Sequence, residues 1–368
     1  MRRGRDRSRS AFEKLARLNQ SGLDLDTLRV GAYEAVRRIV PFEAAFWAVA
    51  DPSTLLFTRA AMDDIPPETA PAFVENEFVR GDVNPWTKVA SEPRVVHSLA
   101  AATGGDLEQS PRFRDILRPI GFGDELRIAF ADRTGVWGFM CLHRGLDDPP
   151  FSAEDAAFVR RTSKTIAQGI RTSILLTASR FQGEHPAVPG LVLLSEDLQL
   201  VGSNDAGADW LERIGDHDLI EGIPSVLYLV AAALRGRPGV PPRATRTLTR
   251  SGWASVIPSW MDVGGTRHIA LLIEEPAAVE LAPLIVSAFG LTAQESKIVG
   301  LLCRGSSTAD ISQELVISRH TVQDHMKSIF DKMGASNRRE LVAGLLSGHY
   351  LPRAMALEPI NRRGQFDH

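Results

Sequence analysis

The segment ISRHTVQDHMKSIFDKMGAS at residues 317–336 decides the fold of the carboxy-terminal part of this chain. Its apolar residues recur at helical spacing and fall within one stripe about 100° wide. The stripe predicts a helix packed on a small core through Val322, Met326, Ile329, Phe330 and Met333.

The opposite face of this helix mixes charges of both signs. It holds His320, Asp324, Lys327 and Asp331, with Gln323 and Ser328 at its margins. Gln, Lys and Asp side chains can bond to adenine, guanine and the cytosine amino group in a major groove. An ordinary solvated helix face has the same composition, so the helix alone leaves both interpretations open.

Two helix-start signals precede this segment. Thr292 with Glu295, and Ser307 with Asp310, have the spacing of capping boxes. They predict a first helix at about 293–303, which a glycine at position 305 can end, and a short second helix that ends at position 315.

The third helix starts at Ser318 and ends at Gly334, and residues 337–346 form a fourth. Only Val316 and Ile317 separate the second helix from the third. Such a tight connection is typical of a helix-turn-helix.

The spacing of residues 291–346 closely resembles the LuxR-type DNA-binding domain. The matching positions are Leu291, Thr292, Glu295, Gly305, Ser307, Ile311, Leu315, Ile317, Ser318, Thr321, Val322, His325, Ile329, Lys332, Met333, Arg338 and Leu341. Two positions depart from the family pattern: Gln323 stands where a lysine is frequent, and Ala309 where a basic residue is common. These departures put two of the family's phosphate or base contacts in doubt.

The resemblance implies a DNA-binding set on and around the third helix. Its predicted members are Thr308, Ser318, Arg319, His320, Thr321, Gln323, Asp324, His325, Lys327 and Arg338. Asp324 is the unusual member, because a carboxylate near phosphates either selects a cytosine or weakens binding.

The local charge of residues 291–346 is low. Seven Lys and Arg residues against six Asp and Glu residues leave a charge of +1. Neutralised phosphates supply most non-specific affinity, so one such module should bind DNA weakly. A homodimer on two half-sites would compensate. Val342, Leu345 and Leu346 could mediate that pairing, although they could equally complete the core of the monomer.

The whole composition is that of an ordinary globular protein. The chain has 368 residues, a net charge of −3, 44% hydrophobic and 24% charged residues, which favours two or three domains without a polycationic surface. Its two cysteines have no disulfide or C-x-x-C pattern, and no apolar run is long enough to span a bilayer. Residues 1–8 are rich in arginine but precede no apolar export segment. We therefore expect a disordered basic arm in a cytoplasmic protein without a membrane partner.

Residues 9–180 have the pattern of an α+β domain. Helical patterns at 10–20 and 24–39 precede strand-like runs at 44–50 and 54–60. A predicted hairpin at 125–144 and a long capped helix after Ser152 follow. This order of elements resembles a GAF domain, a bacterial sensory fold.

Residues 188–275 predict a second α+β domain, after a Gly- and Pro-containing boundary at 182–190. The stretch LVLLSEDLQLVGSNDAGADWL resembles the strand hairpin and short helix of a PAS domain. The fold class is therefore multidomain: GAF-like and then PAS-like α+β sensory domains, and an all-α four-helix helix-turn-helix domain at 285–350. The tail at 351–368 is expected to lack fixed structure.

The usual catalytic motifs are absent from the sequence. We find no phosphate-binding loop, nucleophile elbow or zinc-protease motif, so we predict that the chain is not an enzyme and has no cofactor. Cys141 and His143 lie on one face of a predicted strand, but two donors fall short of a metal site, and a buried Cys beside a strand-end His is the more probable interpretation. Trp47, Trp86 and Trp137 could line a ligand pocket or belong to the core.

These features favour a bacterial one-component transcription regulator. Its partners would be double-stranded promoter DNA, a second copy of itself and RNA polymerase, together with a small-molecule effector that the sequence does not identify. The alternative is a protein-interaction scaffold whose helix-turn-helix is degenerate and binds DNA weakly or not at all.

Overall fold

The computed structural model describes residues 2–20, 23–92, 95–180, 188–215, 219–236, 243–249, 252–276, 280–281, 284 and 288–347. It divides the chain into two compact units. The first contains nearly all of residues 1–173 together with 187–275, and the second consists chiefly of residues 276–368. The tail predicted at 351–368 lies outside the described residues.

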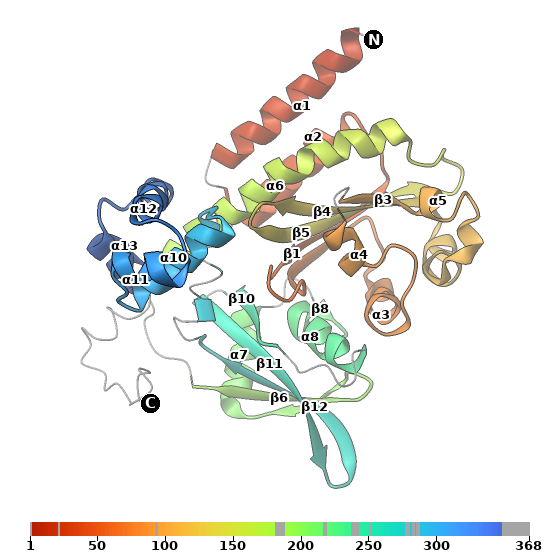
Figure 1. The fold of residues 1–368 in the computed structure, drawn as a ribbon. Helices are drawn as coiled ribbons and strands as arrows, with labels where there is room; N and C mark the ends of the chain where they lie inside the picture. Colours follow the sequence, from red (N-terminus) through yellow and green to blue (C-terminus); the bar gives the residue numbers. More distant parts are fainter. Residues whose placement is uncertain are drawn as a thin grey trace. The chain divides into compact units, whose positions relative to one another are not determined.

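The first unit contains an antiparallel sheet in the order β2-β1-β5-β4-β3. The strands are β1 (Ala44–Ala50), β2 (Phe57–Asp63), β3 (Val96–Ser98), β4 (Phe122–Asp132) and β5 (Gly135–Gly145). Helices α2 (Leu25–Arg37) and α6 (Ala153–Arg180) lie along one face, while α3 (Ala70–Glu75), α4 (Trp86–Ser91) and α5 (Leu99–Ala102) belong to the excursion between β2 and β4 (Figure 1).

The alternation of side chains along these strands explains the two faces. Trp47 and Phe130 stack at a centroid distance of 4.6 Å, and Tyr33 of α2 contacts Trp47 edge-on at 5.8 Å. On the other face, Phe139 packs on Trp86 of α4 at 4.9 Å. Both faces are therefore buried, and the sheet forms the middle layer of this part of the molecule.

Two sequence predictions in this region need correction. The second strand begins at Phe57 rather than at residue 54, because Leu55 has a left-handed φ of 60° in a turn whose Ser53 amide donates to the Asp51 carboxylate. Helix α1 (Arg2–Gln20) begins at Arg2, so residues 2–8 are helical and not a disordered arm. Once a helix is nucleated, each added residue contributes one more hydrogen bond, and arginine is a good helix former.

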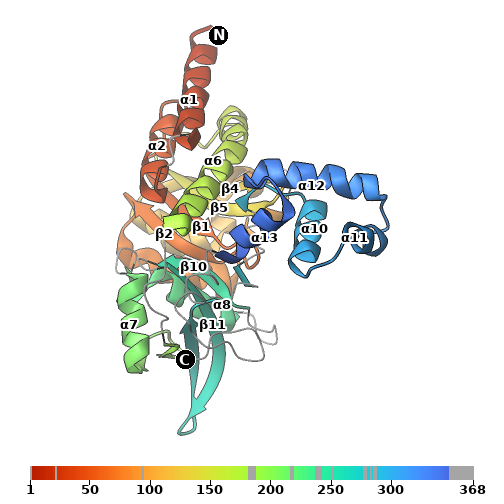
Figure 2. The same ribbon diagram turned by 90° about the vertical axis from the view of Figure 1, so that its left-hand side faces the viewer.

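A second five-stranded sheet has the order β10-β11-β12-β6-β7. Its elements are β6 (Gly190–Ser195), β7 (Leu200–Ser203), α7 (Asp205–Ile214), α8 (Ser225–Gly236), β10 (Thr245–Thr249), β11 (Gly252–Val263) and β12 (Thr266–Glu274), with a small β8–β9 ladder at Leu219–Ile220 and Ile223–Pro224. The strand hairpin and the short helix after it lie where the sequence predicted them, and Asn204 caps that helix, α7. Figure 2 shows the long β11–β12 hairpin edge-on.

The two sheets of the first unit share one hydrophobic core. Every residue of α8 from Ser225 to Leu234 is buried, and this helix packs on the second sheet as well as on β2 and α3. At its end, the backbone of Gly236 approaches Phe78 so closely that a Cβ would collide with the Phe78 carbonyl. The sequence pattern indicated two separate segments, and the structure packs both into one compact unit.

The second unit contains the helices α10 (Ala293–Cys303), α11 (Thr308–Glu314), α12 (Arg319–Met333) and α13 (Arg338–Ser347). Its core includes Val322 and Ile329, which are fully buried, and Met326, Phe330 and Met333, which are partly buried. The predicted apolar stripe of α12 is thereby confirmed. In the described part of the chain, no helix combines the length and the apolar composition that a bilayer span requires.

Candidate functional site

The helix-turn-helix is held together by local capping. The predicted capping boxes are present: the Glu295 amide donates to the Thr292 hydroxyl, and the Asp310 amide to the Ser307 hydroxyl. Ser318 caps α12 by accepting from the Thr321 amide at 3.0 Å. These caps satisfy amides that would otherwise lack partners at the helix starts.

The turn between α11 and α12 depends on one strained residue. Val316 has a φ of 54°, a left-handed conformation that a β-branched side chain rarely adopts, and it is 89% exposed. The Ser312 hydroxyl donates to the Ile317 carbonyl at 2.6 Å across the turn. The left-handed backbone of Val316 and this hydrogen bond form the turn between α11 and α12.

Helix α12 presents a row of exposed polar side chains at helical spacing. Arg319, His320, Gln323, Asp324 and Lys327 are all exposed. The carboxylate of Asp324 lies 3.8 Å from His320 Nε2, a contact so exposed that it contributes little to stability. The row can therefore reach bases or phosphates without first breaking strong internal contacts.

The other predicted site residues are less free. Thr308, Thr321 and His325 are half-buried, and the Ser318 and Thr321 hydroxyls lie 2.8 Å apart within the cap of α12. Arg338 donates to the Leu302 carbonyl at 3.3 Å, which ties α13 to the end of α10.

An ion pair that the sequence analysis missed links α10 to α12 through the buried Glu295. Lys332 Nζ lies 2.9 and 2.7 Å from the two carboxylate oxygens of Glu295, and the Ser328 hydroxyl donates to Glu295 at 2.7 Å. Burial opposes ionisation of Glu295, but these donors and the Thr292 amide lower its pKa to about 2. The sequence signal was the family match at both Glu295 and Lys332, which by itself did not indicate that the two residues meet.

A second candidate site is a cavity of about 250 Å³ in the first unit. Most of its wall is apolar, with Phe46, Phe57, Trp86 and Leu229 among the lining side chains. Of the three tryptophans considered from the sequence, Trp86 lines this cavity, Trp47 is buried on the other face of the sheet, and Trp137 is buried outside the cavity lining. Such a largely apolar cavity is suited to a small ligand.

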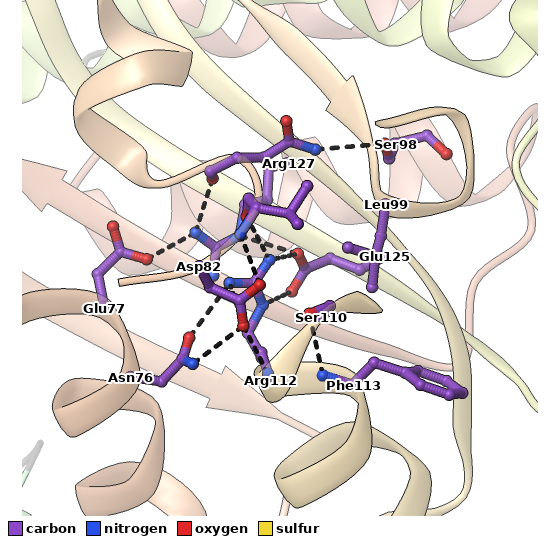
Figure 3. A network of polar contacts seen from close by, with 12 residues as sticks. Asn76, Glu77, Asp82, Ser98, Leu99, Ser110, Arg112, Phe113, Glu125 and Arg127 are labelled. Atoms are coloured by element: carbon purple, nitrogen blue, oxygen red, sulfur yellow. Dashed lines mark hydrogen bonds and ion pairs between the residues drawn. The ribbon is translucent and has the colours of Figure 1, made fainter. Parts of the chain in front are cut away.

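The polar end of this cavity is a network of buried charges (Figure 3). Arg112 donates to Glu125 through Nε at 3.0 Å and Nη2 at 2.6 Å, and Arg127 Nη1 donates to Glu77 at 2.7 Å. Asp82 accepts from the Asn76 side chain and from the Arg112 amide. These contacts join residues that are between 6 and 50 positions apart in the sequence.

The charges of this network shift the pKa values of its members. Although burial opposes ionisation of Glu125, the charges of Arg112 and Arg127 lower its pKa to about 2. Burial lowers the pKa of His143 to about 4, and burial together with the Glu125 charge raises the pKa of the Cys141 thiol well above its usual value. At neutral pH the network therefore contains an ionised Glu125, a neutral imidazole and a protonated thiol.

Comparison with known proteins covers mainly the second unit. Residues 290–344 match the family described as "Bacterial regulatory proteins, luxR family". The chain is 42% identical over 53 residues to the "Probable transcriptional regulatory protein SgaR" of Hyphomicrobium methylovorum, and the match covers 14% of this chain and 25% of SgaR. It is 36% identical over 56 residues to the "Spore germination protein GerE" of Bacillus subtilis (strain 168), and the match covers 15% of this chain and 76% of GerE.

One distant structural neighbour contains a GAF domain. The GAF domain/HD domain protein of Geobacter sulfurreducens is 23% identical with a TM-score of 0.31, covering 40% of this chain and 93% of that one, and the likeness carries no further conclusion. The match to GerE, which spans most of that protein, and the capped helix-turn-helix at residues 290–344 together show the family. The chain belongs to the luxR family of bacterial regulatory proteins.

Proposed function

We propose that this chain is a sequence-specific DNA-binding transcriptional regulator whose amino-terminal α+β region responds to a small molecule or a partner. The observation that carries the proposal is the exposed row on α12, held at a fixed angle by a capped helix-turn-helix. In a helix-turn-helix the second of its two helices, which here is α12, lies in the major groove. The four helices α10–α13 would then form one DNA-binding domain.

The predicted contact residues take different roles within this proposal. Gln323, Asp324 and Lys327 would face base edges, while Arg319 and His320 would lie near the phosphates at the start of α12. Thr308, Thr321 and His325 are close enough to the surface for supporting contacts. Ser318 would contribute through the cap of α12, and Arg338 through its contact with Leu302.

The low local charge favours a dimeric arrangement on DNA. With seven basic and six acidic residues in 291–346, a single domain neutralises few phosphates. Two copies on adjacent half-sites would add their affinities. Val342 is half-buried, and the side chains of residues 345 and 346 lie outside the described set. We also propose that the protein acts in the cytoplasm and that RNA polymerase is one of its partners.

The first unit would act as the sensor. We assign β1–β5 to a GAF-like region at 9–180 and β6–β12 to a PAS-like region at 188–275, and no catalytic activity is part of the proposal. An effector in the cavity would act by preferring one arrangement of the protein, and its effect would be limited by its differential affinity for the two states.

The decisive experiment is selection of DNA sequences from a random pool by the full-length protein at several salt concentrations. A regulator enriches one motif, with half-sites about one helical turn apart if it binds as a dimer. A protein-interaction scaffold enriches no motif at any salt concentration, and this outcome would refute the proposal. Repeating the selection in the presence of cellular metabolites tests sensing separately from DNA binding.

A further inference from the structure

Three side chains with metal-ligating atoms converge at the polar end of the cavity. Glu125 on β4, and Cys141 and His143 on β5, each place one ligand atom so that the three lie within 4.8 Å of one another. All three residues are buried and line the cavity. In the sequence only Cys141 and His143 lie close together, and two donors are too few for a metal site. The neighbouring strands β4 and β5 bring Glu125 to them as a third donor.

We propose that Glu125, Cys141 and His143 bind a divalent transition-metal ion of borderline softness, such as Zn²⁺. A carboxylate, a thiolate and an imidazole form a donor set that such ions prefer. With three protein ligands, the remaining coordination position faces the cavity, where water or a small molecule can bind. The inference does not depend on DNA binding.

The first support for the site is an unsatisfied ring nitrogen. Among the described residues, His143 Nδ1 is buried without a hydrogen-bond partner. Leaving a buried polar atom unpaired costs about 1–3 kcal/mol. The imidazole is held by stacking on Phe122, with ring centroids 5.0 Å apart and planes 17° apart, so the nitrogen is fixed in position. A metal ion would give it the partner that it lacks.

The second support is the charge of the network. Three buried carboxylates, on Glu77, Asp82 and Glu125, face two buried guanidiniums, on Arg112 and Arg127, which leaves one negative charge uncompensated. An uncompensated charge in the interior is costly. A divalent cation that displaces the thiol proton of Cys141 to solvent adds one net positive charge and restores the balance.

The third support concerns the lone pairs of Glu125. A carboxylate has about four acceptor positions. Arg112 occupies two of them, through Nε at 3.0 Å and Nη2 at 2.6 Å, while Arg127 Nε lies 3.0 Å from the carboxylate as a charge partner only. Positions are therefore left for a metal ion, and Arg112 holds the carboxylate in place, as groups beyond the direct ligands commonly do in metal sites.

Metal titration of the full-length protein tests the site directly. After dialysis against a chelator, the protein should bind Zn²⁺ in competition with a chromophoric chelator. Co²⁺ should produce thiolate-to-cobalt charge-transfer absorption. Cys141→Ser should abolish this absorption, and both Cys141→Ser and His143→Gln should weaken Zn²⁺ binding at least about tenfold, since loss of even a supporting group costs that much.

Two matched controls use the other cysteine and a second histidine of the first unit. Cys303→Ser removes the exposed thiol, and His268→Gln removes a histidine that bonds to the Thr266 carbonyl outside the cavity. Both variants should bind metal as the unmodified protein does. If the folded unmodified protein shows no thiolate-to-cobalt absorption, or if Cys141→Ser binds as tightly as Cys303→Ser, the inference is wrong. The titration contains no DNA, so its failure would leave the proposed function untouched.

Discussion

At the scale of single residues, our proposal gives Asp324 and Lys327 opposite contributions to DNA binding. Both are exposed on the same row of α12. Lys327→Ala should weaken binding and reduce the slope of log affinity against log salt by about 1, because one positive charge is removed from the groove. Binding isotherms at several salt concentrations measure this slope. An unchanged slope and affinity would place Lys327 outside the interface.

Asp324→Asn separates selection of a base from simple repulsion. The amide keeps the shape but removes the negative charge. If Asp324 accepts from a cytosine amino group, the variant should change preference at one base position, at a cost of about 1–3 kcal/mol for the original base. A uniform rise in affinity for every sequence would instead show that the carboxylate acts only by repelling phosphates.

Val316 is a residue at which stability can be increased. A left-handed conformation costs an L-residue about 1–2 kcal/mol, and the side chain is 89% exposed, so little packing is lost on its removal. Val316→Gly should therefore raise the free energy of unfolding of the second unit by up to about 1 kcal/mol. Denaturant unfolding measures this change. The reference variant is Val342→Ala, at a half-buried valine in ordinary helix. A decrease in stability would show that the valine side chain contributes contacts in the turn.

Whether a contact in the site could be predicted depended on how far apart its two residues lie in the sequence. The caps at Thr292 and Ser307 involve partners three residues away, so the sequence pattern predicted them. The pairing of Glu295 with Lys332 joins residues 37 apart, and no local pattern indicates it. The convergence of Glu125 with Cys141 likewise depends on how two strands align, which periodicity does not specify.

At the scale of secondary-structure elements, the contact between α10 and α12 depends on Glu295. Its folded-state pKa of about 2 lies below the ordinary value of 4.5. A lowered pKa contributes stability that is present above the unfolded-state value and is lost as the pH falls toward the folded-state value. Stability of the second unit should therefore be constant from pH 7 to about 5 and fall by about 3 kcal/mol between about pH 5 and 2.

The variant Glu295→Gln tests that assignment. It should be less stable than the unmodified chain at pH 7 and should lose this part of the acid sensitivity. Asp331→Asn, which removes an exposed carboxylate of α12, is the control and should leave the pH profile unchanged. Equal acid sensitivity in Glu295→Gln and the unmodified chain would show that other carboxylates govern the transition.

Most elements were predictable because their periodicity and caps are local. The first strand, Ala44–Ala50, lies where the apolar run predicted it. The second strand was displaced because the turn at Leu55 requires a left-handed residue, and leucine carries no signal for that conformation. Strand β3 was missed, since three residues are too few to show an alternating pattern.

At the scale of the whole molecule, a buried ion pair joins the two sheets of the first unit. Arg246 on β10 donates to the Asp51 carboxylate through Nε at 2.9 Å and Nη2 at 2.6 Å. Burial opposes ionisation of Asp51, but its contacts with Arg246 and Ser53 lower its pKa. Because the two residues are 195 positions apart, this pair contributes only when both sheets are folded.

Removing one partner of this pair should be more damaging than removing both. Asp51→Asn should destabilise the first unit by about 3–5 kcal/mol, because it leaves a buried guanidinium without its charge partner. The double variant Asp51→Asn, Arg246→Met should recover much of the loss. In the unmodified chain, thermal unfolding should show the two sheets melting in one transition. Additive effects of the two single changes would show that the residues do not interact.

The charge of +1 on residues 291–346 also has a consequence for how many copies of the protein a cell needs. The genome offers about 10⁶–10⁹ competing non-specific sites, and they sequester a DNA-binding protein in proportion to its charge-driven affinity. A nearly neutral domain is lost to this reservoir less than a strongly basic one. Few molecules would then suffice to find an operator, and a change in affinity caused by an effector would alter the occupancy of that operator at most in proportion.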